Sequence, residues 1–466
     1  MILATQAPSI VWAANSSMST SGAGFLRAQG RWVVDQSGSL VLLRGANFEG
    51  YEYGQWDMHT EADYQQMSSW GFNVVRLPIA WNFIEPRPGQ YDETLFSRYV
   101  DRDIAWAKKY GIYAIIDLHQ YGWSPYFTYY DYWIDGNAAG VPSWGVSGYP
   151  NTSQGEAQAK ADFWSNMGPN GTLSSNTNPS MQDRFMQVWK YVAGRYSQEE
   201  TIAGYDIFNE PMIYSMNGDI SYDADKLRSE TLPAFYNKAV DTVRTVDNNH
   251  MIFWEPGVVN KITSPPDRPN VIYSPHYPGG WITNGYDGNT ARLQASLDEW
   301  VLVPSQEWNQ PAFVGEWGMR VEGANVTQYI VDLANLMDEH LVGAAWWAYA
   351  KWNGFGMYLL DEAGNVRSTL VNNLVRPFIT SSSASLYSSH FDRDAGQFQA
   401  DLKGPGVILL HFPSSYPRSF AVKTDIGVSS FLIFQGTITI SIAEETSRMT
   451  LYLNPSSSLV PTIRTT

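Results

Sequence analysis

Short apolar runs recur between residues 40 and 350 and alternate with segments that have helical spacing. Each run is rich in Val, Ile, Phe, Tyr and Trp, as buried strands are, and most runs precede a segment with apolar residues every three to four positions. Eight runs can be counted in this way, centred on Leu42, Val74, Ile115, Tyr205, Ile252, Ile272, Val314 and Ala345. Parallel strands with helical crossovers in this number predict an α/β protein with a (β/α)8, or TIM, barrel.

The regions on either side of this pattern predict two further parts. The apolar runs 31–34 and 40–43 flank a turn at 35–38, which predicts a β-hairpin leading into the first barrel strand. Helical spacing ends at about residue 380, and seven short alternating runs follow, centred on Leu386, Phe398, Val407, Phe420, Phe431, Ile438 and Leu451. We therefore expect a signal-like or disordered segment at 1–21, the barrel with its hairpin at 22–380, and a small all-β sandwich at 381–466.

Composition narrows the class of protein. The chain has 466 residues, more than one core usually supports. Its net charge of −16 argues against a nucleic-acid partner, because phosphate binding needs an excess of Lys and Arg. No apolar run is long enough for a transmembrane segment, and the absence of Cys excludes a thiolate site. Residues 1–14 are apolar and end in small residues, as a signal peptide does, so we expect a secreted, extracellular protein. We also expect it to be a monomer.

Two of the predicted strands end on a glutamate. The run 202–208 stops at Asn209–Glu210–Pro211, because Pro can neither donate to a strand ladder nor continue a strand easily. The run 311–314 leads in the same way into Gly315–Glu316–Trp317. In α/β barrels the chemistry lies at the C-terminal ends of the strands. A pair of carboxylates at that end is what a glycosidase requires.

Other polar and aromatic side chains are placed at the same end of the predicted barrel. These are Arg76, His119, His276, Tyr277 and Trp347. A single Glu or His at a strand end is more often an ion-pair or hydrogen-bonding residue than a functional one. Several on successive strands of one barrel favour a functional site.

Together these motifs resemble glycoside hydrolase family 5, in the clan of retaining (β/α)8 glycosidases. The resemblance covers residues 40–380 and implies that Glu210 is the general acid/base and Glu316 the nucleophile. It implies these further roles: Asn209 bonds the sugar 2-hydroxyl, Arg76 and Tyr277 orient the nucleophile, His119 and His276 contact the sugar, and Trp347 lies under it. No metal and no organic cofactor is implied.

Within the family, the chain most resembles the glycosylceramidases and endoglycoceramidases. The stretches Glu85–Asp92 and Asp117–Gln120 are similar to theirs, as is the appended sandwich. Two departures stand out. Tyr121 follows Gln120 where that branch has an Asp that contacts glucose, and His276 and Tyr277 are adjacent where the family commonly has a residue between them.

A long aromatic loop at 120–179 and the residues after the eighth strand supply further candidates for substrate binding, Trp123 and Trp352. Two interpretations of the loop are open. Its rings either form a hydrophobic cluster on the outside of the barrel or line a subsite for sugar or lipid.

The sequence thus predicts a cofactor-free, retaining β-glycosidase that hydrolyses β-linked glucans or related oligo- and polysaccharides by double displacement. Tyr121 favours this substrate class over the alternative, a glycosylceramidase or endoglycoceramidase acting on glycolipids. A catalytically inactive carbohydrate-binding protein is the non-enzyme alternative. For catalysis we expect Arg76 to lower the pKa of Glu316, and burial near a negative partner to raise that of Glu210.

Overall fold

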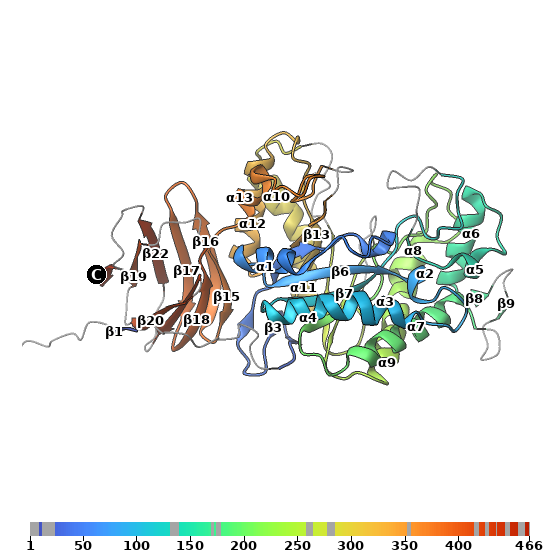
Figure 1. The fold of residues 1–466 in the computed structure, drawn as a ribbon, viewed down its shortest axis with the longest axis horizontal. Helices are drawn as coiled ribbons and strands as arrows, with labels where there is room; N and C mark the ends of the chain where they lie inside the picture. The colour runs from blue at the N-terminus through green and yellow to red at the C-terminus, as the bar shows by residue number, and fades with distance from the viewer. Residues whose placement is uncertain are drawn as a thin grey trace, which may run out of the picture.

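The computed structural model describes residues 9–11, 24–130, 139–168, 172–173, 179–257, 264–276, 285–351, 356–413, 419–424, 428–434, 436–442, 448–454 and 462–465. A barrel surrounded by helices lies beside a stack of C-terminal strands (Figure 1). Among the described residues, none of the helices has the length and apolar character needed to cross a membrane.

Eight parallel strands form the barrel and confirm the predicted fold class. In sheet order they are β12 (Val271–Tyr273), β11 (Met251–Trp254), β10 (Ile202–Asp206), β7 (Tyr113–His119), β6 (Val74–Ala80), β5 (Arg44–Asn47), β14 (Gly343–Trp346) and β13 (Phe313–Trp317). The barrel closes between β12 and β13, where the Tyr273 N–H donates to the Pro311 carbonyl at 3.0 Å and the Gly315 N–H to the Pro275 carbonyl at 3.1 Å. The first barrel strand begins at Arg44, two residues after Leu42.

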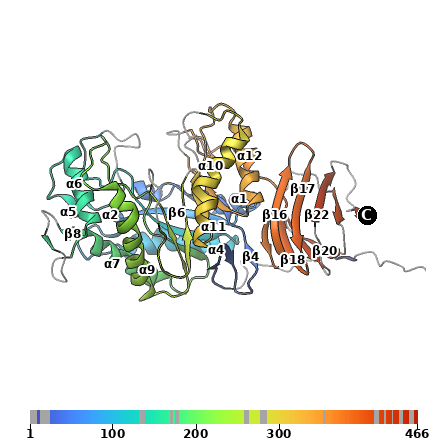
Figure 2. The ribbon, with the colours of Figure 1, turned by 180° about the vertical axis from the view of Figure 1, so that it is seen from behind.

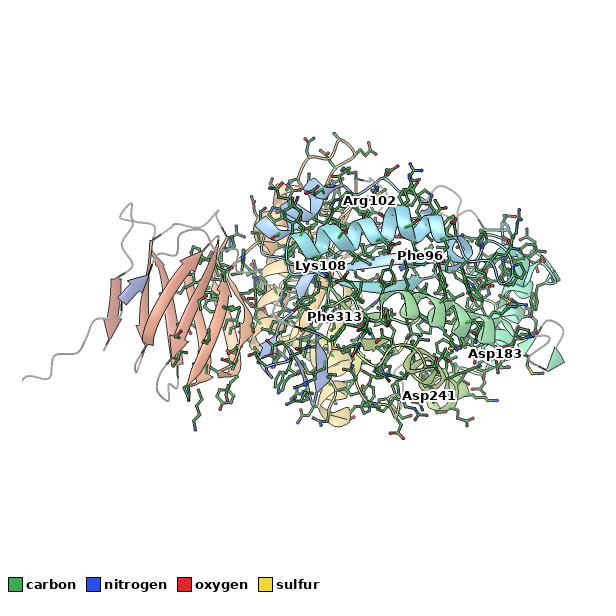
Figure 3. The ribbon with its side chains drawn as sticks, turned by 60° about the horizontal axis from the view of Figure 1, so that its bottom comes forward. Phe96, Arg102, Lys108, Asp183, Asp241 and Phe313 are labelled. Atoms are coloured by element: carbon green, nitrogen blue, oxygen red, sulfur yellow. The ribbon has the colours of Figure 1, made fainter. Side chains whose placement is uncertain are left out.

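Helices cover the outside of the barrel (Figures 1 and 3). They are η1 (Tyr51–Tyr53), α1 (Glu61–Ser69), α2 (Trp81–Ile84), α3 (Glu93–Leu95), η2 (Phe96–Val100), α4 (Asp101–Lys109), α5 (Ser143–Val146), α6 (Ser153–Trp164), α7 (Met181–Tyr196), α8 (Ala224–Lys226), η4 (Leu227–Thr231), α9 (Leu232–Arg244), α10 (Thr290–Leu297), η5 (Asp298–Leu302), α11 (Val303–Trp308), α12 (Val326–Glu339) and α13 (Ser368–Leu374). Local sequence sets their starts: Thr60 and Asp63 form a capping box before α1, and the Ser180 side chain caps α7. A short pair, β8 (Met167–Gly168) and β9 (Thr172–Leu173), lies beyond α6.

The interior of the barrel is layered. Val74, Ile115 and Phe253 belong to one buried apolar cluster inside the sheet. Side chains two positions apart on a strand share a face. The next inward positions on β6 and β7 are therefore Arg76 and Asp117. An apolar floor thus lies beneath a charged layer.

The C-terminal strands form two sheets packed on a second core. One sheet has the order β1 (Ser9–Val11), β20 (Val428–Phe434), β21 (Thr437–Ile442), β18 (Gly406–His411), β15 (Phe378–Ser382), β4 (Leu40–Val41), β3 (Trp32–Val34) and β2 (Arg27–Gln29). The other has the order β16 (Ser385–Asp392), β17 (Gln397–Lys403), β22 (Arg448–Asn454), β19 (Ser419–Thr424) and β23 (Thr462–Thr465). All seven predicted runs are strands. The predicted hairpin is present as β3 and β4, and it joins the first sheet through β15.

Packing contacts and buried ion pairs, in addition to the polypeptide itself, join the barrel to the sandwich. Strand β16 lies beside helix α12 (Figure 2). Asp338 of α12 is 1% exposed and pairs with two arginines, Arg44 of β5 at 2.8 Å and Arg376 just before β15. Leu42 and Leu341 contribute to the core of the sandwich. Of the segment 1–21, residues 9–11 form β1, and the rest lies outside the described residues.

Candidate active site

Arg76 on β6 is the centre of the charged layer and is fully buried. Its nitrogens donate to Asp206 (2.9 Å), Asn47 (3.0 Å), Glu316 (2.9 Å), Asn209 (2.9 Å) and Glu255 (3.3 Å), and Asp117 lies 3.1 Å away. Burial lowers the pKa of Arg76, but the charges of four surrounding carboxylates outweigh it and raise that pKa well above its usual value. The sequence analysis expected Arg76, a substrate-site candidate, to orient the nucleophile, and its bond to Glu316 agrees with that role. The structure corrects only the idea of a direct contact with substrate, because the side chain is enclosed and its donors are occupied by protein.

Four members of this layer were not among the predicted site residues. They are Asn47, Asp117, Asp206 and Glu255. Asn47 and Asp206 end barrel strands, Glu255 directly follows one, and Asp117 lies two residues before the end of β7. Glu255 is followed by Pro256 just as Glu210 is followed by Pro211, and that repetition is the signal that could have identified it.

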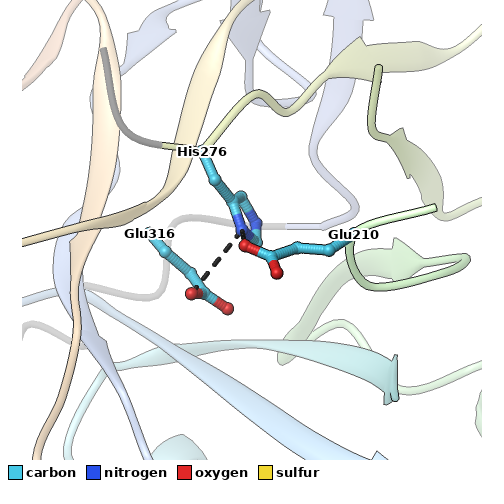
Figure 4. Close-up of side chains that lie close together, drawn as sticks. All are labelled: Glu210, His276 and Glu316. Carbon is cyan, nitrogen blue, oxygen red and sulfur yellow. Dashed lines mark hydrogen bonds and ion pairs between the residues drawn. The ribbon is translucent and has the colours of Figure 1, made fainter. Parts of the chain in front are cut away.

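The two predicted glutamates converge on His276 (Figure 4). His276 Nδ1 lies 3.2 Å from Glu210 Oε1 and 3.5 Å from Glu316 Oε2, and its Nε2 lies 3.2 Å from Glu255 Oε1. One oxygen of Glu210 and one of Glu316 lie within 4.8 Å of each other. This short separation is the range of retaining glycosidases, since inverting enzymes leave room for a water between their carboxyl groups.

The backbone at Glu210 is held in an uncommon conformation. Its φ is +47°, in the left-handed region that non-glycine residues rarely adopt. The Glu210 N–H donates to Glu255 Oε2 at 2.8 Å, and Gln120 Nε2 donates to the carbonyls of Asn209 and Glu210 at 3.0 Å. These bonds fix the direction in which the Glu210 side chain leaves the end of β10.

The pKa values of Glu210 and Glu316 are shifted in directions opposite to those expected from the sequence. Burial lowers the pKa of His276, but Glu255, Glu316 and Glu210 together raise it well above its usual value. Burial raises the pKa of Glu210, but the nearby His276 reverses this and lowers it. Burial raises the pKa of Glu316, against the charges of His276 and Arg76. The predicted directions were therefore wrong, because His276 lowers the pKa of Glu210 and because burial outweighs Arg76 at Glu316.

Three further predicted residues gather on the side of β7 and β14. His119 Nδ1 bonds Asp117 Oδ2 at 2.8 Å, and its ring stacks on Trp347 with centroids 5.5 Å apart. Asn209 Nδ2 lies 3.4 Å from His119 Nε2 and donates to the Gln120 carbonyl at 3.1 Å. Because Asn209 Oδ1 accepts from Arg76, both ends of this amide are oriented.

The remaining candidates are placed differently. Tyr277 and Trp352 lie outside the described residues. Trp123 is 1% exposed and packs on Phe163 (ring centroids 5.2 Å apart) and Phe208 (6.1 Å). The structure corrects this prediction, because Trp123 is a core residue with no face open to a sugar. For Trp123 and the equally buried Phe127, the packing interpretation of the aromatic loop is the right one.

Glu210, His276 and Glu316 are the one group of three acidic or His side chains in the described part of the chain that could hold a metal ion. The same atoms are those that a proton-transfer mechanism brings together. The group therefore needs no metal to account for its geometry.

A closed (β/α)8 barrel with two adjacent glutamates at its strand ends defines a retaining glycoside hydrolase. Comparison with known families agrees. Residues 34–353 match the model for Cellulase (glycosyl hydrolase family 5), so the chain belongs to glycosyl hydrolase family 5.

Relatives of several kinds are similar to the chain, among them endoglycoceramidases and endoglucanases. An endoglycoceramidase of Cyanea nozakii is 22% identical over 84% of this chain and 86% of its own length. Endoglucanase C of Acetivibrio thermocellus is 23% identical over 68% of this chain and 91% of its own. Among solved structures, endo-glycoceramidase II from Rhodococcus sp. in complex with ganglioside GM3 has the same fold, with a TM-score of 0.73 at 20% identity, covering 91% of this chain and all of the other.

Proposed function

We propose that this glycosidase cleaves β-linked glucose or a related hexose, with Glu316 as nucleophile and Glu210 as general acid/base. The observation that carries the proposal is the placement of one oxygen of each within 4.8 Å, with His276 bridging them. Arg76 bonds Glu316 Oε1 at 2.9 Å, which fixes the orientation of the nucleophile.

The reaction proceeds in two displacements. In the first, a Glu316 oxygen attacks the anomeric carbon, the bond to the leaving oxygen breaks, and Glu210 gives that oxygen its proton. In the second, a water gives a proton to Glu210 and attacks the same carbon, which releases the Glu316 carboxylate. Asn209, oriented by Arg76, is placed to bond the 2-hydroxyl, a contact that strengthens as positive charge develops on the ring.

His276 accounts for how Glu210 acquires a proton. The Nδ1 of His276 is 3.2 Å from Glu210 Oε1, and the surrounding carboxylates raise the pKa of His276 well above its usual value. As the Glu316 oxygen bonds to the anomeric carbon, its negative charge is neutralised, and the proton of His276 can pass through Glu210 to the leaving oxygen in the same displacement. We therefore treat Glu210, His276 and Glu316 as one titrating group, whose apparent pKa values belong to the cluster.

The proposed roles are tested by removing each glutamate. We expect Glu316→Ala to lose turnover on every substrate while remaining folded. Glu210→Ala should lose turnover on natural glycosides and retain much of it on 2,4-dinitrophenyl glycosides, whose leaving group needs no proton. Added azide should yield an α-glycosyl azide with the first variant and a β-glycosyl azide with the second. Ordinary hydrolysis by Glu316→Ala would refute the nucleophile assignment.

Two substrate classes have specific support. Likeness to an endoglycoceramidase extends over 84% of the chain, and that to an endoglucanase over 68%. Tyr121, in place of the glucose-contacting Asp of the endoglycoceramidase branch, favours a β-glucan instead. The first observation concerns most of the chain and the second a single position. We therefore propose a glycosylated lipid as substrate, with a β-1,4-glucan as the second candidate.

A product assay separates these candidates. Glucosylceramide dispersed in detergent and soluble cello-oligosaccharides are incubated side by side with the protein. Release of ceramide supports the glycolipid, whereas release of short oligosaccharides alone supports polysaccharide degradation. Inactivity on both, together with activity on an aryl β-mannoside or β-xyloside, would point to another sugar.

We also propose that the protein is exported, as its composition and N-terminal residues suggest, and that it acts as a monomer. Cell fractionation tests the first proposal. Light scattering coupled to size exclusion tests the second, with a mass near the 52.4 kDa of one chain expected.

A further inference from the structure

Helix α6 lies in the long aromatic loop, at the end of the molecule farthest from the sandwich (Figures 1 and 2). It binds the segment that directly follows Glu210 along the chain. Trp164 Nε1 donates to the Met212 carbonyl at 2.9 Å, and Lys160 Nζ donates to the Tyr214 carbonyl at 2.7 Å. Helix α6 therefore fixes the backbone at the second and the fourth residue after the general acid/base.

Lys160 is a charged residue inside this contact. Its side chain is 0% exposed and pairs with the equally buried Glu156 at 2.6 Å, and its ammonium group lies 5.6 Å from the centre of the Trp123 ring. Burial lowers the pKa of Lys160, against the charge of Glu156. Replacing a buried ion pair by apolar residues of similar volume often costs no stability. Stability alone therefore does not account for the pair, whereas the bond to the Tyr214 carbonyl requires a donor such as Lys160.

Tyr214 lies beside the general acid/base and, unlike Lys160, is partly exposed. Burial raises the pKa of Tyr214 to about 12, and the charges of Glu210 and Tyr121 contribute to this rise. Burial raises the pKa of Tyr121 to about 12 as well, again with a contribution from Glu210. Both hydroxyl groups are thus close enough to the Glu210 carboxyl group to be affected by its charge.

The roles of the two glutamates show which part of a substrate lies near Tyr214. The Glu316 oxygen attacks the anomeric carbon from one side, and the bond to the leaving oxygen breaks on the opposite side. Glu210 gives its proton to that oxygen, so the leaving group begins at Glu210 and extends away from Glu316. A partly exposed side chain that follows Glu210 along the chain and lies near its carboxyl group is next to this leaving group.

We propose that Tyr214 contacts the leaving group of the substrate, and that Lys160 is the positioning residue that holds Tyr214 there. This inference rests on the proposed function. The leaving group is ceramide in a glycosylceramide and the next glucose in a β-1,4-glucan, and the product assay distinguishes these two sources. Both present hydroxyl and CH groups close to the cleaved bond. A tyrosine can bind such groups through its O–H and its ring face.

The test measures kcat/KM on two substrates with the same sugar. One is the substrate that the product assay identifies, and the other is the β-glycosyl fluoride, whose leaving group is a single atom and cannot reach Tyr214. We expect Tyr214→Ala to lose about 10–100-fold on the first, because a contact with the leaving group is lost. On the fluoride its loss should stay below about threefold. The alkaline limb of the pH profile on the first substrate, which reports the Glu210 proton, should stay in place.

The role of Lys160 is tested with the double substitution Lys160→Met and Glu156→Gln, since Lys160→Met alone would leave a buried charge without a partner and could prevent folding. This variant should lose about 10-fold on the complete substrate and less than about threefold on the fluoride. Adding Tyr214→Ala to it should cost no more than Tyr214→Ala costs in the wild-type protein, because both changes remove the same contact.

The matched control is Tyr222→Ala. Tyr222 is a partly exposed tyrosine of the same segment, and its hydroxyl lies 2.7 Å from Thr231 Oγ1 of η4. Its loss should leave the ratio of the two kcat/KM values unchanged.

An unchanged ratio in Tyr214→Ala, or a displaced alkaline limb, would overturn the contact between Tyr214 and the leaving group. Losses that add up when the substitutions are combined would overturn the positioning role of Lys160. Each of these results leaves the proposed function standing. A wild-type protein that hydrolyses neither glycosides nor glycosyl fluorides would instead refute the proposed function, and this inference with it.

Discussion

At the scale of single residues, the site is one cation surrounded by acids. Arg76 contacts six polar partners at the ends of five other strands, and four of these partners are carboxylates. Burial raises the pKa of Glu255 to about 8, against the charges of His276 and Arg76. Without the positive charge of Arg76, the layer could not hold so many acids out of water.

Replacing Arg76 by Met should lower the free energy of unfolding by about 3–5 kcal/mol, because the partners of a buried charge are left uncompensated. The deficit should depend on pH. Without Arg76 the pKa values of the buried carboxyl groups rise in the folded state above those of the unfolded chain, so stability is lost as pH increases. Urea denaturation at pH 5 and pH 8 measures this. A deficit of equal size at both values would contradict the charge argument.

Replacing His276 by Gln should shift the whole pH profile of kcat/KM to higher pH. His276 lowers the pKa of Glu210. Without His276, Glu210 keeps its proton to higher pH, so the alkaline limb moves to higher pH. His276 also lowers the pKa of Glu316. In the variant the nucleophile therefore ionises only at higher pH, so the acid limb moves to higher pH as well.

The control for this profile is His250→Gln. His250 is buried, bonds the Glu199 carbonyl at 3.0 Å and directly precedes β11, at the other end of the strands from the site, so its loss should leave both limbs in place. Limbs of the His276 variant that move apart, or do not move, would show that His276 is not charged in the free protein.

At the scale of elements, β13 brings the nucleophile next to His276 because Gly315 precedes Glu316. A Cβ at position 315 would lie 2.8 Å from His276 Nε2 and 2.9 Å from Ser274 Oγ, closer than such contacts occur. The bare backbone at this position is what allows two neighbouring strands to place an imidazole against a carboxylate.

Gly315→Ala should therefore reduce kcat by about 100-fold, since a displacement of about 1 Å in a reacting group has that effect. Its stability cost should stay near 1–3 kcal/mol, as for other overpacked sites. Gly194→Ala on helix α7 is the control, because its nearest neighbour would be 3.8 Å away. Steady-state kinetics and thermal melting distinguish the two variants. A loss of stability without a loss of kcat would contradict the positioning role.

The strands and the two glutamates could be predicted because each is marked locally. Apolar runs give the strands, and Asn209–Glu210–Pro211 marks a strand end by the properties of Pro alone. The partners of Arg76 are marked by nothing local, since an acid at a strand end looks the same whether it faces inward or outward. The bridge made by His276 depends on where β12 and β13 meet when the barrel closes.

Trp123 shows the same limit for aromatic residues. A ring in a loop has one appearance in the sequence whether it packs in the core or lies under a sugar. In this protein Phe163 of α6 contacts Trp123 edge to face, and this contact places Trp123 in the core. That contact exists only once α6 has folded against the barrel.

At the scale of the whole molecule, the barrel and the sandwich share one buried ion cluster. Asp338 pairs with Arg44 of the first barrel strand and with Arg376 at the start of the sandwich, and all three are at most 7% exposed. Both arginines stay positively charged whatever the pH, so Asp338 alone supplies the negative charge on which this contact depends.

Asp338→Asn should therefore cost about 3–5 kcal/mol of unfolding free energy, since two buried cations lose their counter-ion. The control is Asp57→Asn. Asp57 pairs with Arg102 at 3.1 Å on the outer face of α4 (Figure 3), and its side chain is 76% exposed, so less than about 1 kcal/mol is expected. Chemical denaturation measures both. Equal effects of the two substitutions would contradict the role of Asp338 at the junction.

The pairing of β4 with β15 also sets an order of events while the protein is being made. Val41 pairs with Ser381, and 381 − 41 = 340 positions separate them. At about 5–20 residues per second, ribosomes need roughly 17–70 s to reach the second strand after the first. For that time the hairpin presents an open edge, and chaperone capture of nascent chains should peak in this interval and fall once β15 has emerged.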